Sequence, residues 1–357
     1  MAGFAKQIVC LCIAGLASGA FAAPDVRILL DVSAAMSQAD PQNRRVGAVE
    51  VMLRMLPREA HAGVWTYAQD TQTLIEPGRA TGLWRETALI KLPSGLEARG
   101  QGMNLFDAVN TARWDAATSK AAGRHLVVVS AGGVSLPDAA DGGAGLRQRL
   151  LTSRLPELRA AGVTVHTVGV GNNVDRVLLE QLALGTDGYF AVAAAGEDLA
   201  GALIKVLDHA LPPGRLPRAV AGTFRVDAGI EEITVLRLRE QDDPDLVLQS
   251  PLGRRLSRTS SRGEVKWHHG QGYDLLSLRD PTPGDWRFRA GAQGDVRVTA
   301  VGDLALDLGG LSGVMFPGGP LTFSLAVASQ GSQLTDADFL ELLDVSAALD
   351  TPSAQHS

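Results

Sequence analysis

The stretch DVRILLDVSAAMS, residues 25 to 37, decides the fold of this chain of 357 residues. Its apolar run, Val26–Leu30, is typical of a buried strand, and the run ends at Asp31 and Ser33. In an open parallel sheet, ligands bind at the edge where the carboxyl ends of the strands lie. The stretch therefore predicts a central strand that brings two oxygen-bearing side chains to a binding edge.

Strand and helix patterns alternate through the first half of the chain. Helical stripes of apolar residues occur at 46–56, 105–112, 146–158, 177–182 and 199–207. They separate five strand candidates: Val26–Leu30, Ala62–Ala68, His125–Ser130, Val163–Val170 and Tyr189–Val192. This rhythm predicts an α/β domain with a doubly wound, mostly parallel sheet over residues 24–211.

The residues after the first strand resemble the Asp-x-Ser-x-Ser signature of the von Willebrand factor type A domain. The resemblance continues through residues 62–77 and 158–199, so it covers about half the chain. In that family the signature residues, a Thr from a second loop and an Asp from a third loop form a metal-ion-dependent adhesion site. The resemblance therefore implies a Rossmann-like fold and a divalent cation, usually Mg²⁺, at the binding edge.

The metal signature is incomplete in this chain. Asp31 and Ser33 match it, but Ala35 stands at the second Ser, Met103 at the Thr, and Ala131 at the second Asp. Mg²⁺ requires near-octahedral oxygen coordination and gains little from methyl or thioether groups. We therefore predict that the fold is kept while the metal site has decayed.

Two alternatives remain for the polar residues at this edge. Asp31, Ser33 and Ser130 could form a weak Mg²⁺ or Ca²⁺ site, with Asp138 as a substitute carboxylate. Alternatively, Asp31 and Ser33 hydrogen-bond the backbone of the adjoining loop, and Asp138 only forms a turn.

The amino terminus predicts export. Residues 1–22 combine Lys6, an apolar core at Ile8–Leu16 and the small-residue ending Ala20-Phe-Ala22, which is the pattern of a signal peptide. We expect a periplasmic or secreted protein. Cys10 and Cys12 lie inside this segment, so the mature chain would contain no disulfide. No later apolar run is long enough for a transmembrane helix.

Charge argues against nucleic acid as a partner. The formal net charge is −6, and acidic and basic residues are interspersed without a basic stripe.

The second half of the chain has an all-β texture. A Pro-rich linker is predicted at 212–222, a β-sandwich at 223–330, and a short helix with a disordered tail at 331–357. Tyr273-Asp-Leu followed by Pro283-Gly-Asp-Trp286 resembles immunoglobulin-like and fibronectin-like modules, and we expect Trp286 in its core. The whole arrangement resembles a group of exported bacterial proteins that carry a type A domain.

Motifs for catalysis are weak, and we expect no enzyme. The turn Gly169-Val-Gly171 lacks the third Gly and the Lys of phosphate-binding loops. His268 and His269 are adjacent on a predicted strand, where neighbouring side chains point to opposite faces and do not converge on a metal.

Three functions remain. The leading hypothesis is a non-catalytic module, without a cofactor, that binds a protein partner in the cell envelope through a face containing Ala35, Met103, Asn104, Ala131 and Asp138. The second is weak Mg²⁺- or Ca²⁺-dependent adhesion. The third places a hydrolase in the β-domain.

Overall fold

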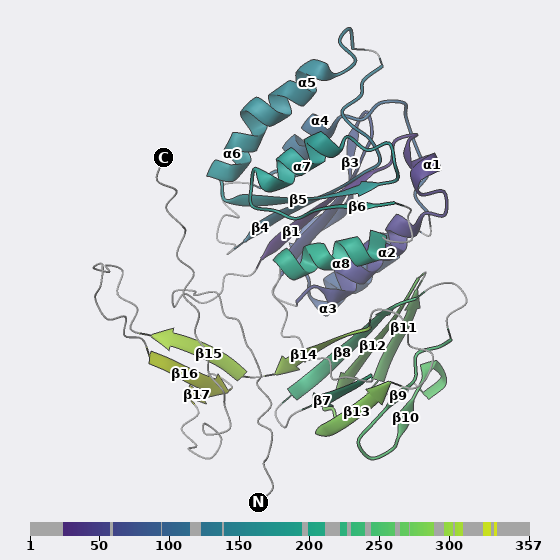
Figure 1. The fold of residues 1–357 in the computed structure, drawn as a ribbon, viewed down its shortest axis with the longest axis vertical. Helices are drawn as coiled ribbons and strands as arrows, with labels where there is room; N and C mark the ends of the chain where they lie inside the picture. The colour runs from purple at the N-terminus through teal and green to yellow at the C-terminus, as the bar shows by residue number, and fades with distance from the viewer. Residues whose placement is uncertain are drawn as a thin grey trace, which may run out of the picture.

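A computed structural model describes the chain in segments (Figure 1). The described residues are 24–57, 60–93, 95–114, 123–137, 139–194, 199–210, 222–226, 230–239, 244–260, 265–270, 272–288, 296–302, 304–309, 324–329 and 332–333. The predicted signal peptide, Asp138, most of the predicted linker and the predicted helix near the carboxyl terminus lie outside them.

The first module is a six-stranded sheet whose strands are β1 Asp25–Asp31, β2 His61–Tyr67, β3 Thr71–Arg79, β4 Arg124–Ser130, β5 Val163–Val170 and β6 Phe190–Ala193. Their order is β3-β2-β1-β4-β5-β6. All neighbouring pairs are parallel except β2 and β3. This confirms the predicted doubly wound sheet.

Helices cover both faces of this sheet, and they are α1 Met36–Ala39, α2 Arg44–Met55, α3 Gly82–Lys91, α4 Leu105–Thr111, α5 Ala144–Arg149, α6 Leu155–Ala160, α7 Arg176–Leu184 and α8 Leu199–Ala210. Apolar side chains of α2 and α8 form one core with the sheet, and those of α4, α6 and α7 form a second core on the other face (Figure 1). Strand β1 lies between these cores, and all seven of its residues are buried.

Two helices differ from the sequence prediction. The stripe at 146–158 is not one regular helix, because a π-helical turn at Leu150–Arg154 separates α5 from α6. Pro156 follows this turn and cannot donate a backbone hydrogen bond into it. Helix α3 was not predicted, since Ala88 is its one buried residue while Leu83 and Ile90 are 77% and 84% exposed.

The second module contains two antiparallel four-stranded sheets, built from β7 Thr223–Val226, β8 Ile230–Leu238, β9 Leu248–Gln249, β10 Arg255–Leu256, β11 Val265–Gly270, β12 Tyr273–Arg279, β13 Gly284–Phe288 and β14 Val296–Gly302. The sheet orders are β10-β9-β13-β7 and β11-β12-β8-β14, and both contribute to one apolar core. Trp286 is in that core as predicted, 2% exposed, and its Nε1 donates to the Thr282 carbonyl at 2.9 Å. A further sheet pairs β15 Leu304–Gly309, β16 Ser324–Ser329 and β17 Ser332–Gln333.

The β-module packs against helices of the first module. Successive residues of β12 point to opposite sides, so Leu276 enters the sandwich core while Leu275 joins the core formed by α2 and α8. Leu236 and Tyr273 join the same interface. An ion pair between Arg297 and Asp208 of α8 borders it. The second sheet therefore buries apolar residues on both of its faces.

Among the helices of the described segments, none combines the length and apolar character needed to cross a membrane.

A pair of histidines, buried His166 and half-buried His125, lies within the first module. His166 Nδ1 accepts the Tyr189 amide at 3.1 Å, so the proton of neutral His166 is on Nε2, which faces His125 Nδ1 at 3.1 Å. Burial lowers the pKa of His125 to about 4 and that of His166 to about 3, and in His166 the neighbouring His125 and His209 add to the effect. Both imidazoles therefore stay neutral in the folded chain at pH 7.

Replacement of Leu275 tests the packing between the modules. Leu275→Ala should lower the free energy of unfolding by about 2–5 kcal/mol and speed hydrogen exchange in α2 and α8, because it opens a cavity beneath them. Leu276→Ala is the matched control, since its cavity lies in the sandwich core. Unchanged exchange in α2 and α8 for Leu275→Ala would contradict the docking.

The histidine pair predicts instability in acid. Both folded pKa values lie below the unfolded value of about 6.5, so the unfolded chain binds more protons between these limits. The contribution of the neutral histidines to the free energy of unfolding is fully present above pH 6.5. As the pH falls from 6.5 toward 4, the free energy of unfolding decreases by roughly 1.4 kcal/mol per pH unit for each histidine. Urea unfolding from pH 4.5 to 6.5 should show a shallower slope in His125→Gln. An unchanged slope in His125→Gln would contradict this role of the pair.

Candidate functional site

Three loops meet at the carboxyl edge of the parallel sheet. Asp31 ends β1 and Ser130 ends the neighbouring β4. The segment before α4 reaches the same edge, where Met103 pairs with Ser135 through backbone hydrogen bonds in both directions. The tertiary fold therefore brings together the three segments that carry the predicted site residues.

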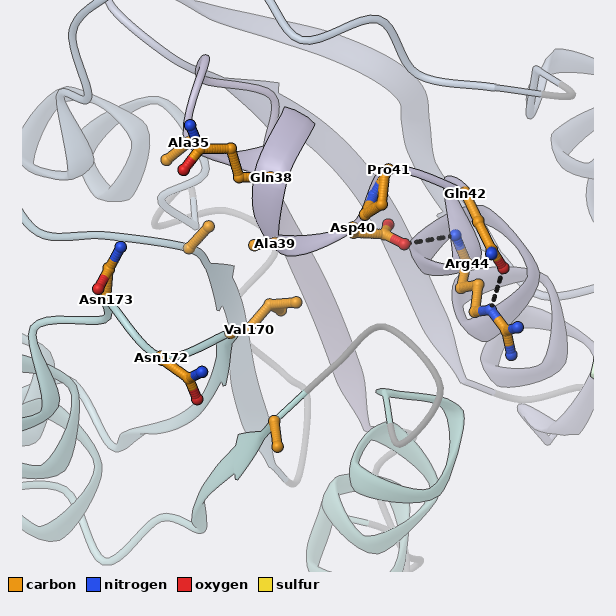
Figure 2. A pocket seen from close by; sticks show the side chains of 13 residues that line it. Ala35, Gln38, Ala39, Asp40, Pro41, Gln42, Arg44, Val170, Asn172 and Asn173 are labelled. Atoms are coloured by element: carbon orange, nitrogen blue, oxygen red, sulfur yellow. Dashed lines mark hydrogen bonds between the residues drawn. The ribbon is translucent and has the colours of Figure 1, made fainter.

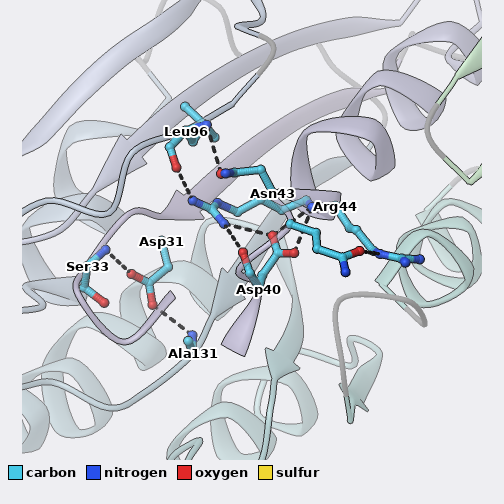
Figure 3. Close-up of polar contacts among 9 residues, drawn as sticks. Asp31, Ser33, Asp40, Asn43, Arg44, Leu96 and Ala131 are labelled. Carbon is cyan, nitrogen blue, oxygen red and sulfur yellow. Dashed lines mark hydrogen bonds and ion pairs between the residues drawn. The ribbon is translucent and has the colours of Figure 1, made fainter. Parts of the chain in front are cut away.

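Asp31 joins two of these loops through its carboxylate. Its Oδ1 accepts the Ser33 amide at 2.7 Å, and its Oδ2 accepts the Ala131 amide at 2.8 Å (Figure 3). The residue is completely buried. Burial raises the pKa of Asp31, while the Ala131 amide, the side chain and amide of Ser33, and the Arg45 charge oppose that rise. Both carboxylate oxygens are thus engaged by the protein's own backbone.

The two serines have different environments. The Ser33 side chain is buried beside Asp31, and its hydroxyl interacts with the Asp31 carboxylate and lowers its pKa, although no hydrogen bond of ordinary geometry forms within the described segments. The Ser130 hydroxyl donates toward the Met103 sulfur at 3.4 Å and the Gly132 carbonyl at 3.2 Å. The Ser130 hydroxyl is therefore better satisfied than that of Ser33.

The other predicted contact residues are at different depths. Ala35 is exposed, next to α1. Met103 and Ala131 are only 4% and 3% exposed, so they pack beneath the loops of this edge and present little surface to a partner. Asn104 is half-buried and begins α4, where its Oδ1 accepts the Asp107 amide at 3.1 Å. Of these four residues, Ala35 and Asn104 are the ones with accessible surface.

This donor set differs chemically from a magnesium cage. It offers one carboxylate, with both oxygens already accepting amide protons, and two hydroxyls. Mg²⁺ requires octahedral oxygen coordination, and Ala35 and Met103 contribute no oxygen. Across the described part of the chain, no three His, Cys, Asp or Glu side chains gather in a metal-binding arrangement.

A buried ion pair that the sequence analysis missed supports the loop after α1. Asp40 accepts hydrogen bonds from the amides of Arg44 and Arg45 at 2.8 and 3.0 Å, and from Arg45 Nη1 at 2.8 Å (Figure 3). Arg45 Nη2 donates to the Leu96 carbonyl at 2.5 Å. The dipeptide Asp40-Pro41 could have predicted this role of Asp40, since an Asp before Pro is typical of turns and helix starts.

A cleft opens beside these loops. Its volume is about 430 Å³, and it separates α1 and the loop after it from the loop after β5 (Figure 2). The lining residues are Ala35, Gln38, Ala39, Asp40, Pro41, Gln42, Arg44, Ala131, Val170, Gly171, Asn172, Asn173 and Ala194. Of the predicted contact residues, Ala35 and Ala131 border it.

Among known families, the model of the von Willebrand factor type A domain matches residues 25–203. No curated protein matches the sequence.

Several solved structures are similar to this chain. A von Willebrand factor type A protein from Catenulispora acidiphila is 12% identical with a TM-score of 0.42, and the match covers 88% of this chain and 64% of that one. Proximal thread matrix protein 1 from the mussel byssus is 17% identical with a TM-score of 0.41, over 52% and 48% of the two chains. BatB from Bacteroides thetaiotaomicron is 14% identical with a TM-score of 0.37, over 52% and 98%. This chain thus spans less than two thirds of the first two proteins.

Removal of the Asp31 carboxylate should destabilise the fold even without metal. In EDTA, Asp31→Ala should lower the free energy of unfolding by about 3 kcal/mol, because two buried amides lose their acceptor. Asp31→Asn keeps one acceptor oxygen and should lose roughly half as much. Urea unfolding measures both values. The exposed Asp70→Ala is the control, and equal stability of Asp31→Ala and the natural sequence would refute this role.

Proposed function

This chain belongs to the von Willebrand factor type A domain family, and we propose that it is an exported, non-catalytic module that binds a protein partner in the cell envelope. The proposed binding face is the carboxyl edge of the six-stranded sheet, around Ala35 and Asn104. The pattern of residues 1–22 supports export to the periplasm or the exterior. The β-module, which we propose to be immunoglobulin-like or fibronectin-like, packs on α2 and α8.

We propose that binding at this face needs no bridging cation. The observation that supports this most directly is the pair of amide hydrogen bonds that engages both oxygens of Asp31. The Ser33 and Ala131 amides each occupy one lone pair of the one carboxylate in the set, which leaves fewer sites for a cation. These backbone amides, rather than a cation, supply the positive partial charge that a buried carboxylate requires.

One observation favours the second candidate, weak Mg²⁺- or Ca²⁺-dependent adhesion. The Ser33 hydroxyl is buried beside Asp31 and makes no hydrogen bond of ordinary geometry in the described segments, and Ser33 matches a metal-ligand position of the family signature that the sequence resembles. In this alternative, Asp31, Ser33 and Ser130 hold the ion, with Asp138 as the added carboxylate.

Site-specific photocrosslinking tests the proposed face. With a photoreactive amino acid in place of Ala35, the chain should form a crosslinked species with an envelope protein in producing cells, and EDTA should leave its yield unchanged. The same replacement at Arg159, an exposed residue of α6 near the opposite edge of the sheet, is the control. Equal crosslinking at both positions, or none at Ala35, would reject the face.

Thermal unfolding distinguishes the two candidates. With millimolar Mg²⁺, Ca²⁺ or Mn²⁺ after EDTA treatment, we expect no rise in Tm. A cation at 100 times its Kd would add about 2.7 kcal/mol of stability, which is a visible shift. A rise that disappears in Ser33→Ala would instead support the metal-dependent alternative.

A further inference from the structure

We propose that the hairpin of β9 and β10 docks this chain on an anionic phospholipid surface, with Leu252 inserted among the lipids and with Arg255 and Arg287 at the phosphates. The inference goes beyond the proposed function and does not depend on it. It assigns a second contact surface, on the β-module, to a chain in which no described helix is long and apolar enough to cross a membrane.

The turn between β9 and β10 presents an apolar side chain to solvent. Leu252 is 82% exposed, at the third position of the turn Ser250-Pro251-Leu252-Gly253. The Gly253 amide closes the turn by donating to the Ser250 carbonyl at 2.9 Å. Pro251 has a fixed φ, and a Cβ at Gly284 would lie 3.0 Å from its ring, so the turn packs closely on the start of β13. The leucine is therefore held outward in advance, and its insertion would cost little ordering of the chain.

Two arginines share the outer face of the sheet beside this turn. Gln249 of β9 lies in register between Arg255 of β10 and Arg287 of β13. Residues directly opposite each other on neighbouring strands point to the same face, and the adjacent Leu256 and Trp286 point into the sandwich core. The three polar residues therefore form a row on the outer face, which we call the arginine row. The spacing of strands places the backbones of its two arginines about 10 Å apart.

The charge of the arginine row is available to a ligand. Arg255 and Arg287 are both exposed, and neither side chain makes a hydrogen bond or ion pair with the residues that the structure describes. The chain as a whole has a formal net charge of −6, but residues 246–263 contain four arginines and no Asp or Glu. The row forms only in the folded sheet, because its two arginines come from strands that are distant in the sequence.

The acidic residues of this sheet do not neutralise the row. Asp285 of β13 pairs with Arg225 of β7 at 4.0 Å. Asp245 precedes β9, so it lies beyond the end of that strand that is away from the turn. The outer face beside Leu252 therefore keeps a positive charge.

The position of the row leaves it open to a large surface. The sheet β11-β12-β8-β14 packs on α2 and α8 through Leu275, whereas the sheet β10-β9-β13-β7 lies on the other side of the sandwich core (Figure 1). The arginine row therefore faces away from the first module. Docking through this face leaves the first module uncovered.

An anionic bilayer matches both parts of this surface. A guanidinium binds a phosphate with two parallel N–H groups, and an aliphatic side chain gains free energy when it leaves water. A bilayer offers phosphates at its surface and hydrocarbon directly beneath them. An acidic polysaccharide or an acidic protein segment would satisfy the arginines but would leave Leu252 in water. The combination of Leu252 with the arginine row therefore favours a lipid surface.

Vesicle sedimentation tests the proposal on the chain without residues 1–22, because that apolar segment would itself bind lipid and every described residue follows it. The probes are vesicles of phosphatidylcholine alone and vesicles with equal parts of phosphatidylcholine and phosphatidylglycerol. We expect about 25-fold tighter binding to the anionic vesicles, since each arginine contributes about fivefold. Salt at about 1 M should remove this preference, because it shortens the screening length to about 3 Å.

Substitutions separate the charge from the apolar tip. Arg255→Gln and Arg287→Gln should each weaken binding to the anionic vesicles about fivefold, whereas Arg255→Lys should keep most of it. Leu252→Ala should weaken binding about tenfold. Arg159→Gln, at an exposed arginine of α6, is the matched control and should change nothing. Thermal unfolding shows that each variant is folded.

A fluorophore distinguishes insertion from attraction to the surface. The two cysteines of the sequence, Cys10 and Cys12, both precede residue 23, so an introduced cysteine is the single labelling site. A polarity-sensitive label on Leu252→Cys should brighten and shift to the blue on anionic vesicles. The same label on Leu83→Cys, a 77% exposed position of α3, is the control and should not respond.

Several results would overturn the proposal. These are no binding to anionic vesicles, equal binding to both kinds of vesicle, unchanged binding when both arginines are replaced by Gln, or equal responses of the labels at Leu252 and Leu83. Binding of soluble poly-glutamate through the arginine row, without binding to vesicles, would assign the row to an acidic polymer and reject the lipid surface. Crosslinking at Ala35 tests the proposed function separately, so either proposal can fail while the other stands.

Discussion

The carboxylate of Asp31 holds together the point at which the two halves of the sheet meet. Strand β1 pairs with β2 on one side and β4 on the other, and the chain leaves these strands toward opposite faces. One carboxylate bonded to the amides of Ser33 and Ala131 connects the loops after β1 and β4. A buried carboxylate is costly without such partners. The same hydrogen bonds that satisfy Asp31 therefore set the geometry of the candidate binding edge.

Electrostatic compensation within the protein extends from Asp31 to the neighbouring loop. Asp40 and Arg45 form a buried pair, in which two backbone amides and the Leu96 carbonyl satisfy additional polar atoms. The charges of Asp40 and Arg45 are therefore compensated within the protein.

The β-module constrains the first module from another side. Its second sheet has two apolar faces, since Leu276 packs in the sandwich and Leu275 packs against α2 and α8. The β-module covers α2 and α8. The carboxyl edge of the six-stranded sheet stays accessible near the cleft. The sequence Asp274-Leu-Leu-Ser-Leu278 indicates a strand that is buried on both faces, because its apolar residues occur at both odd and even positions.

The sequence by itself determined the fold class and the central strands, because hydrophobic periodicity is local: predicted Val163–Val170 is β5, and Trp286 is in the β-core. It also showed which oxygen ligands were missing at residues 35, 103 and 131. Only the tertiary structure decided that Met103 and Ala131 are buried, that Asp31 accepts an amide 100 residues away, and that Arg45 compensates Asp40. Burial and hydrogen bonding between distant segments depend on how the loops pack together at the edge of the sheet. The periodicity of a local stretch of sequence does not specify that packing.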